Sequence, residues 1–224
     1  MAIINSLAIG KARKSAGNLT FATIQGRTIA REKPVNVRNP RTEKQLAQRS
    51  KMSKTVAAYR NIGFMTKHLF TKLPKYTSQY NQFVKENIGI ADNFEIIEET
   101  GKVTNVEGLM ISNGDTLPFL TSLEVDYGDV TFGWNPDDAA KNFIKVGDYW
   151  QIIVVEEATG NCKVINSKEF VEEGESGGLT VSKSEDYLPV GIEGPIFVSV
   201  VYYSPSRNLS SVGRLERFEN EPQG

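Results

Sequence analysis

Residues 17–60 read GNLTFATIQGRTIAREKPVNVRNPRTEKQLAQRSKMSKTVAAYR, a glycine-punctuated run of β-prone residues followed by a helix start. In the first half, Leu19, Phe21 and Ile24 are interleaved with polar residues and are expected on one side of an extended strand. A turn at Gly26 separates them from a second β-prone run, which is the usual signal for a hairpin. The stretch therefore predicts a β-hairpin that leads into a helix.

The second half carries two overlapping helix-start signals. Asn39 can cap a helix, and Pro40 suits the first helical position because proline has no N–H group to leave unpaired there. Thr42 and Gln45 form a second possible capping box. Side chains at spacings of three and four then predict an amphipathic helix that ends near Gly63 and exposes a basic face. The residues of the predicted stripe are Leu46, Arg49, Met52, Val56 and Tyr59.

Four motifs in this part resemble those of a family of unknown function that is widespread in Bacteroidota and their phages. They are G-N at 17–18, R-x-K-P at 31–34, N-P-x-T-x-x-Q at 39–45 and Q-R-x-K at 48–51. The resemblance is specific over the N-terminal third and looser beyond it, where residues 132–135 match a tryptophan-bearing strand. Because the family has no established activity, the resemblance implies an architecture and a phage or bacterial setting, but no catalytic residue.

Length and composition are those of an ordinary soluble globular protein. The chain has 224 residues, of which 39% are apolar and 24% are charged. No apolar run approaches the roughly 20 residues that a membrane span needs, and we expect no signal peptide because the first positive charges follow the apolar opening. The single cysteine, Cys162, excludes an internal disulfide framework and fits a protein assembled in a reducing cytoplasm.

A near-zero net charge hides a strong polarisation along the chain. Of the 26 lysines and arginines, 17 lie in residues 1–85, where the only acids are Glu32 and Glu43. The other 9 bases and 25 of the 27 acids follow, so the two parts carry +15 and −16. Such asymmetry indicates an acidic partner for the basic part: nucleic acid, an acidic protein surface or the acidic half of a neighbouring copy. Internal neutralisation of one half by the other is the alternative.

The predicted fold class is α+β in two domains. Residues 1–90 form a basic arm, the hairpin and a helical docking region, in which the arm at 10–17 is either ordered on a partner or a solvated loop. Tyr76 begins a further predicted helix that runs to Gly89. Residues 91–104 are a linker or first strand. Seven or eight short strands then predict an antiparallel Ig-like or fibronectin-like β-sandwich at 105–224.

No reactive constellation accompanies this architecture. The only histidine, His68, and Cys162 fall in different predicted domains, so no catalytic, cofactor-binding or metal-ligating residue is predicted, and no cofactor is expected. The basic residues are candidate contacts to a partner: Lys11, Arg13, Lys14, Arg31, Lys33, Arg49 and Lys51.

We therefore predict a non-enzymatic structural or assembly protein, a phage virion component assembled in the bacterial cytoplasm, whose partners are other copies or other virion proteins. A bacterial binding or surface-associated protein and a nucleic-acid-binding module are the alternatives, because they can use the same basic residues. A membrane partner is not expected.

Overall fold

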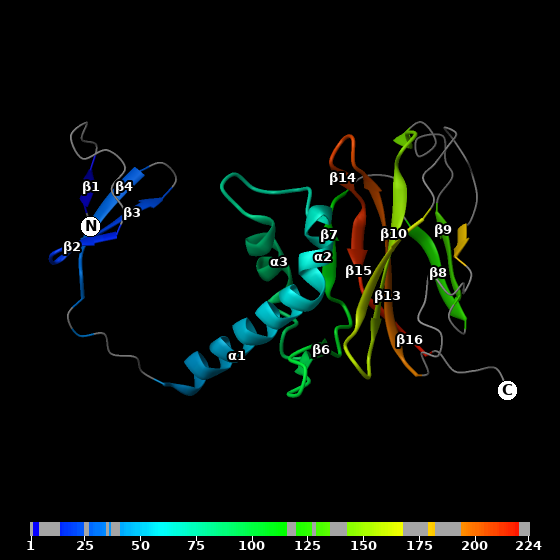
Figure 1. The fold of residues 1–224 in the computed structure, drawn as a ribbon, viewed down its shortest axis with the longest axis horizontal. Coiled ribbons are helices and arrows are strands. Elements are labelled where there is room, and N and C mark those ends of the chain that lie inside the picture. Colours follow the sequence, from blue (N-terminus) through cyan, green and yellow to red (C-terminus); the bar gives the residue numbers. More distant parts are fainter. Residues whose placement is uncertain are drawn as a thin grey trace. The chain divides into compact units, whose positions relative to one another are not determined.

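The structure, a computed structural model, forms two compact units, Met1–Leu46 and Ala47–Gly224 (Figure 1). It combines an N-terminal sheet, one long helix and several antiparallel sheets, which confirms the predicted α+β class at this level. The residues that it describes are 2–4, 14–24, 27–34, 36, 41–115, 120–126, 129–134, 143–167, 179–181 and 194–219.

The first unit is a four-stranded antiparallel sheet in the order β1-β4-β3-β2. The predicted hairpin is its centre, since β3 and β4 pair from Leu19 with Glu32 to Ile24 with Arg27. The turn residues between them, and the predicted caps Asn39 and Pro40, lie outside the described residues. The strands are β1 (Ala2–Ile4), β2 (Lys14–Ala16), β3 (Leu19–Ile24) and β4 (Arg27–Glu32).

Two expectations about this sheet were wrong. Part of the predicted arm is itself a strand, because Lys14–Ala16 pairs with β3 through a turn in which Gly17 adopts a φ of 57°. That left-handed backbone suits glycine, which has no Cβ to clash. Ile24 does not share a face with Leu19 and Phe21, because successive side chains of a strand point to opposite faces. Residues 14–16 of the predicted arm thus form an edge strand of the sheet.

A continuous helical segment follows. It consists of α1 (Glu43–Ala58), the π-helical turn η1 (Tyr59–Gly63), α2 (Phe64–Thr66) and the 3-10 turn η2 (Lys67–Leu69). Gly63 was expected to end it but has a helical φ of −64°. A Cβ on Gly63 would lie 2.7 Å from Tyr59 Cδ2 and 2.8 Å from Phe83 Cε2. The glycine therefore makes room for an aromatic ring instead of terminating the helix.

The buried side of α1 also differs from the predicted stripe. Leu46 and Met52 are 48% and 38% exposed, whereas Thr55 and Ala58 are fully buried. The reason is that residues 43–50 are exposed on every side of the helix, so only its later turns contact a core. The long apolar side chains at its start remain on the surface.

The next helix, α3 (Gln79–Asn87), begins later than predicted. Tyr76 precedes it with a φ of 66° and is 66% exposed, and Ser78 Oγ caps the helix by accepting from the N–H of Asn81 at 3.2 Å. At its other end, the Asn87 amide donates to Met110 O at 2.9 Å and accepts from Met110 N–H at 2.7 Å. These bonds join α3 to the adjoining strand β7 (Met110–Asn113).

The remaining strands lie close to the predicted β-prone runs. A five-stranded antiparallel sheet has the order β11-β10-β13-β14, with β16 also paired to β13; β12-β9-β8 form a second sheet, and β15-β7 and β5-β6 are pairs. Their bounds are β5 (Glu95–Ile96), β6 (Val103–Thr104), β8 (Leu120–Asp126), β9 (Asp129–Trp134), β10 (Tyr149–Glu156), β11 (Cys162–Asn166), β12 (Leu179–Val181), β13 (Ile196–Ser204), β14 (Leu209–Ser210), β15 (Val212–Arg214) and β16 (Glu216–Phe218).

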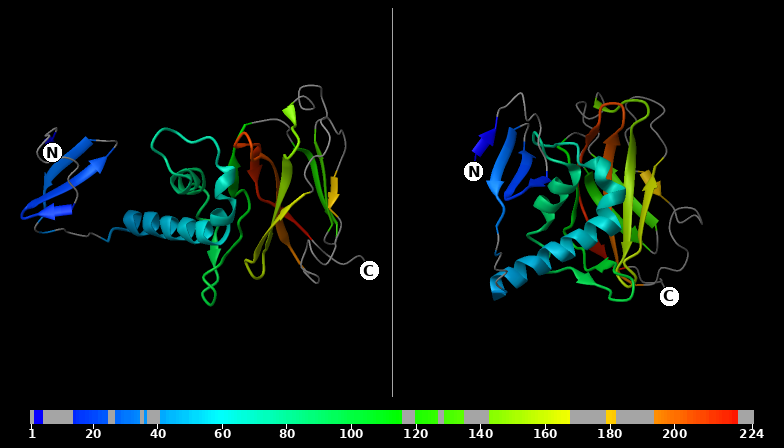
Figure 2. Two further views of the ribbon diagram at one scale, coloured as in Figure 1. Left: turned by 45° about the horizontal axis from the view of Figure 1, so that its top comes forward. Right: turned by 60° about the vertical axis from the view of Figure 1, so that its left-hand side comes forward.

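The five-stranded sheet is buried on both faces. Ile153 of β10 and Val201 of β13 join a core with Phe83 of α3, whereas Ile152 of β10 packs with Trp134 of β9 in a second core. Figure 1 and Figure 2 show helices on one side of β10 and β13 and strands β8 and β9 on the other. Burial on both faces explains why β10 and β13 are continuous apolar runs without polar alternation.

This layering joins the helices to the sheets. Ala91, Phe94 and Val103, from the predicted linker at 91–104, are fully buried in the same core as Phe83. Along the chain, the boundary between the two compact units falls after Leu46, whereas the sequence placed the domain boundary at residues 91–104. Independent folding of 105–224 stays a prediction.

Candidate functional site

The N-terminal sheet presents two arginines on one face. Arg27 and Arg31 are four residues apart on β4, with Ile29 between them on the same side, and β3 contributes its paired residues to that side. We call this side the arginine face. It consists of Thr20, Ala22, Ile24, Arg27, Ile29 and Arg31. Both arginines and Ile24 are exposed, and Glu32 points to the opposite side, so none of the described residues of this face is acidic.

The side chains that the structure describes in this sheet form almost no core of their own. Thr28 and Ala30 are its only buried side chains among those described, and Leu19 and Ile24 are 46% and 56% exposed. Small strand assemblies need an apolar face packed against another layer for independent stability. The described residues of the N-terminal unit bury little apolar surface. This unit is therefore a candidate for docking on a partner.

The predicted contact residues fall in different surroundings. Arg31 lies on the arginine face, whereas Lys14 pairs with Phe21 and so points to the other side. Lys33 is exposed beyond β4, and its N–H donates to Asn18 O at 2.7 Å. Lys11 and Arg13 lie outside the described residues. Arg27 was missed, although its even, four-residue spacing from Arg31 on a β-prone run was a usable signal.

The two predicted contacts on α1 also differ. Arg49 lies on the exposed first part of the helix. Lys51 instead makes an internal ion pair, with its Nζ 2.6 Å from Asp92 Oδ2, and Lys54 Nζ donates to Asp92 O at 3.0 Å. A partly exposed pair of this kind contributes about 0–1 kcal/mol. Lys51 therefore helps to hold α1 against the segment after α3.

The start of α1 has the geometry of a capped helix. Thr42 directly precedes Glu43, and its Oγ1 accepts from the N–H of Gln45 at 3.4 Å. Thr42 O also accepts from the N–H of Leu46 at 2.9 Å, the first bond of the helical ladder. Side-chain capping satisfies an N–H group that has no partner within the helix, which fixes where the helix begins.

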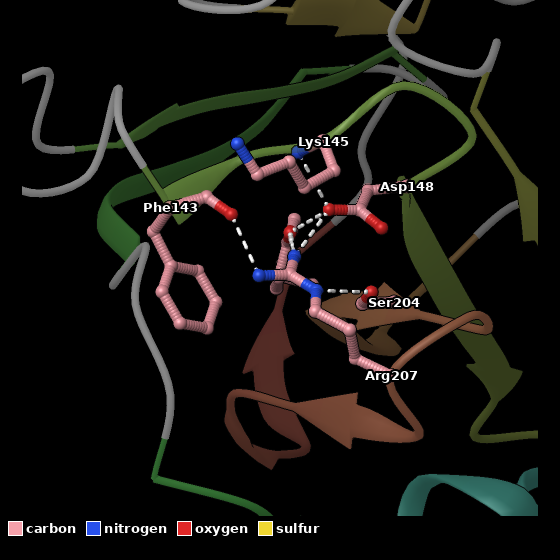
Figure 3. A network of polar contacts seen from close by, with 6 residues as sticks. Phe143, Lys145, Asp148, Ser204 and Arg207 are labelled. Carbon is pink, nitrogen blue, oxygen red and sulfur yellow. Dashed lines mark hydrogen bonds and ion pairs between the residues drawn. The ribbon is translucent and has the colours of Figure 1, made fainter.

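A buried polar network that the sequence analysis missed lies beside the second core (Figure 3). The Asp148 side chain is fully buried. Its Oδ2 accepts from Arg207 Nη2 at 2.6 Å, from the N–H of Lys145 at 2.8 Å and from the Tyr202 hydroxyl. Burial, followed by the neighbouring carboxylate, raises the pKa of Tyr202, so this hydroxyl stays protonated and donates.

Arg207 is the centre of the same network. Its Nε donates to Ser204 Oγ at 2.9 Å and its Nη1 to Phe143 O at 2.8 Å, while its guanidinium carbon lies 4.3 Å from the Phe143 ring centroid. These contacts fix the segment before β10 to the turn after β13. Removing one partner of a buried ion pair leaves an uncompensated charge, so the network acts as a structural clamp.

A second buried cluster consists of hydroxyl groups. Ser112 Oγ lies 3.0 Å from Leu69 O, Ser210 Oγ lies 2.8 Å from the same carbonyl, and Thr71 Oγ1 is 3.0 Å from Ser210 Oγ. The cluster joins the end of the helical segment to β7 and β14. These hydroxyls bond backbone groups and one another, which is the bonding of a structural latch.

The titratable residues His68 and Cys162 are both partly covered by the core. The His68 ring lies edge-on to Tyr203 with centroids 5.0 Å apart, and burial lowers its pKa below 6.5. Burial raises the pKa of the Cys162 thiol to about 12. Within the described part of the chain, no group of three His, Cys, Asp or Glu side chains could hold a metal ion. The helices described there include none long and apolar enough to cross a membrane.

Comparison with known proteins gives one family match. A family model described as a family of unknown function (DUF6266) matches residues 10–94, which is less than half of the chain. The match runs from just before β2 to the turn before β5, so it includes the arginine face and the helices. No curated protein and no solved structure matches the chain. The match is consistent with the uncharacterised family that the motifs resemble, and it brings no activity.

Proposed function

We propose that this protein is a non-enzymatic structural component of a bacteriophage particle that docks through its basic N-terminal half. The observation that carries the proposal is the N-terminal sheet, which has two exposed arginines on one face and, among its described side chains, buries only Thr28 and Ala30. Packing a partner on the arginine face would cover its exposed Ile24 and neutralise the arginines.

The C-terminal part is proposed to present an Ig-like or fibronectin-like β-sandwich. Support comes from the core between the β8–β9–β12 sheet and the five-stranded sheet, in which Trp134 and Trp150 pack with ring centroids 6.3 Å apart. Two antiparallel sheets with an apolar interior have the layers of such a sandwich. The helices on the far face of the five-stranded sheet are an addition to that scheme.

The phage setting rests on the motif resemblance of the N-terminal third. It is tested by gene order, because a virion protein is expected beside genes for capsid, portal or tail proteins. A chromosomal neighbourhood without any of these genes would instead favour the bacterial binding or surface-associated protein.

Nucleic-acid binding is the competing function, because Arg27 and Arg31 also suit phosphate groups. Sedimentation velocity over a range of protein concentrations, beside anisotropy titrations of a labelled duplex, separates the two. Binding to duplex DNA falls with salt with a log-log slope of about −0.9 per phosphate neutralised. We expect DNA binding to vanish near about 0.15 M salt, where the Debye length is about 8 Å, and protein association to persist. Tight DNA binding there by a protein that stays monomeric at high concentration would refute the proposal.

A further inference from the structure

Three exposed glutamates gather on the β5–β6 hairpin. Glu95 lies on β5, and Glu98 and Glu99 lie in the turn that connects it to β6. The turn is closed by the N–H of Gly101, which donates to Ile97 O at 2.7 Å. We call this element the acidic hairpin and define it as residues 95–104. It joins a negative surface to an apolar side chain, because Ile96 is 38% exposed.

The acidic hairpin is fixed to the rest of its unit. Val103 at its base is fully buried, and Lys102 Nζ donates to Asn161 Oδ1 in the β10–β11 turn. Gly160 of that turn packs so closely that an added Cβ would lie 2.9 Å from Val103 O, and Asn61 Nδ2 donates to Gly160 O at 2.8 Å. Helix, turn and hairpin thus hold one another, so the glutamates are displayed on a supported element.

The glutamates of the acidic hairpin differ from the acids that ion pairs neutralise within the molecule. Several other acids are neutralised internally: Asp92 by Lys51, Asp115 by Lys72 and Glu157 by Arg217. Glu95, Glu98 and Glu99 have no ion-pair partner among the described residues, and the same holds for the arginines of the arginine face.

The two surfaces complement each other in charge and in apolar character. The arginine face combines Arg27 and Arg31 with exposed Ile24, and the acidic hairpin combines glutamates with exposed Ile96. Opposite charges steer association and suppress wrong partners, while an apolar contact at the centre supplies affinity that salt does not screen.

We propose that the arginine face of one copy docks on the acidic hairpin of a second copy. The inference rests on the proposed assembly function and names the partner. Because the two surfaces are different parts of the chain, each copy can use its arginine face and its acidic hairpin at the same time. Reciprocal use of both surfaces by two copies produces a closed two-fold dimer, and use of each surface for a different neighbour produces a ring or a filament.

A charge-swap experiment on the full-length protein tests this contact. The two variants are R27E/R31E and E95K/E98K, and association is measured by sedimentation velocity at about 0.1 M salt, where screening is partial. Each variant alone is expected to associate at least about tenfold more weakly than the wild type, because like charges then face each other. An equimolar mixture is expected to recover association, since each variant supplies the surface that its partner now requires.

A matched control separates a surface effect from a net-charge effect. The variant R41E/K44E makes the same change in charge within the same unit, at exposed positions outside the sheet, and is expected to associate like the wild type. Circular dichroism confirms that each variant is folded. If a reversed variant is unfolded, the neutral pair R27Q/R31Q and E95Q/E98Q is measured instead, and each is expected to weaken association at least about threefold, since attraction is lost without repulsion.

The outcomes distinguish the inference from the proposed function. The proposed contact is wrong if the equimolar mixture does not recover association, or if R41E/K44E weakens association as much as the charge-swap variants do. Where the neutral variants are used, it is also wrong if they associate as strongly as the wild type. If the wild type and every variant associate alike, the contact is wrong while the assembly function stands. A wild type that stays monomeric and binds DNA tightly at about 0.15 M salt, with loss of DNA binding in R27E/R31E, overturns both.

Discussion

Replacement of Gly63 by alanine tests the packing of the helical segment against α3. The new Cβ would lie 2.7 Å from Tyr59 Cδ2 and 2.8 Å from Phe83 Cε2, distances that require one ring to move. The Phe83 ring has little room, because it is fully buried and also contacts Phe70, with centroids 5.8 Å apart. Overpacking of this kind costs about 1–3 kcal/mol. Alanine regains up to about 1 kcal/mol of helix propensity, so a cost of about 2 kcal/mol, the middle of that range, leaves an expected net loss of about 1–2 kcal/mol.

The assay is urea unfolding monitored by circular dichroism. The urea midpoints of the variant and the wild type are compared, provided that the unfolding free energies of both proteins depend equally on urea concentration. Gly89 offers a matched control, because it is exposed and nothing lies within 4 Å of an added Cβ. G89A is expected to be neutral or to stabilise by up to about 1 kcal/mol through the unfolded chain. If G63A were as stable as the wild type, Gly63 would not be required for ring packing, and its role would have to be sought elsewhere.

Further predictions concern the buried polar and titratable groups. R207M is expected to destabilise by about 3–5 kcal/mol, because it leaves the Asp148 carboxylate buried without its counter-charge; a loss under about 1 kcal/mol in urea unfolding would contradict the clamp. Burial lowers the pKa of His68 below 6.5, so its neutral form stabilises the fold fully above pH 6.5 and this contribution is lost as the pH falls through the lowered pKa. The free energy of unfolding of H68Q should therefore depend less on pH between pH 7.5 and 5 than that of the wild type. Parallel plots of unfolding free energy against pH for the two proteins would refute this. With a pKa of about 12, the Cys162 thiol is expected to react with a disulfide reagent at pH 8 much more slowly in the folded protein than in denaturant, and equal rates would contradict its burial.

Several features of the fold could be predicted because they depend on residues close in sequence. The β3–β4 hairpin follows from β-prone runs around a glycine, and the start of α1 follows from Thr42 and Gln45. The strands β10 and β13 were recognisable as continuous apolar runs. Predictions failed where the same residue pattern can arise for two different physical reasons. A glycine ends helices often, yet Gly63 is present because a ring packs on it.

The sequence predicts that the candidate site is basic, but it does not predict the geometry of that site. Charge polarisation along the chain indicated a basic contact surface, and Arg31 was among the residues named for it. Arg27 and Arg31 share a face because they are an even number of residues apart on one strand, whereas the register between β2 and β3 places Lys14 on the opposite face. Lys51 was named as a partner contact, yet it bonds Asp92 within the fold, because α1 passes beside the segment after α3.

The sequence by itself determined the local elements, the separation of basic and acidic residues and the scarcity of reactive side chains, since each of these is a property of composition or short-range periodicity. Only the tertiary structure decided which elements and which distant side chains pack against one another. It placed helices on one face of the β10–β13 sheet and strands on the other, and it joined Asp148 to Arg207 across 59 positions of the chain. Contacts of that range arise from close packing of distant segments, and no periodicity within either segment encodes the partner.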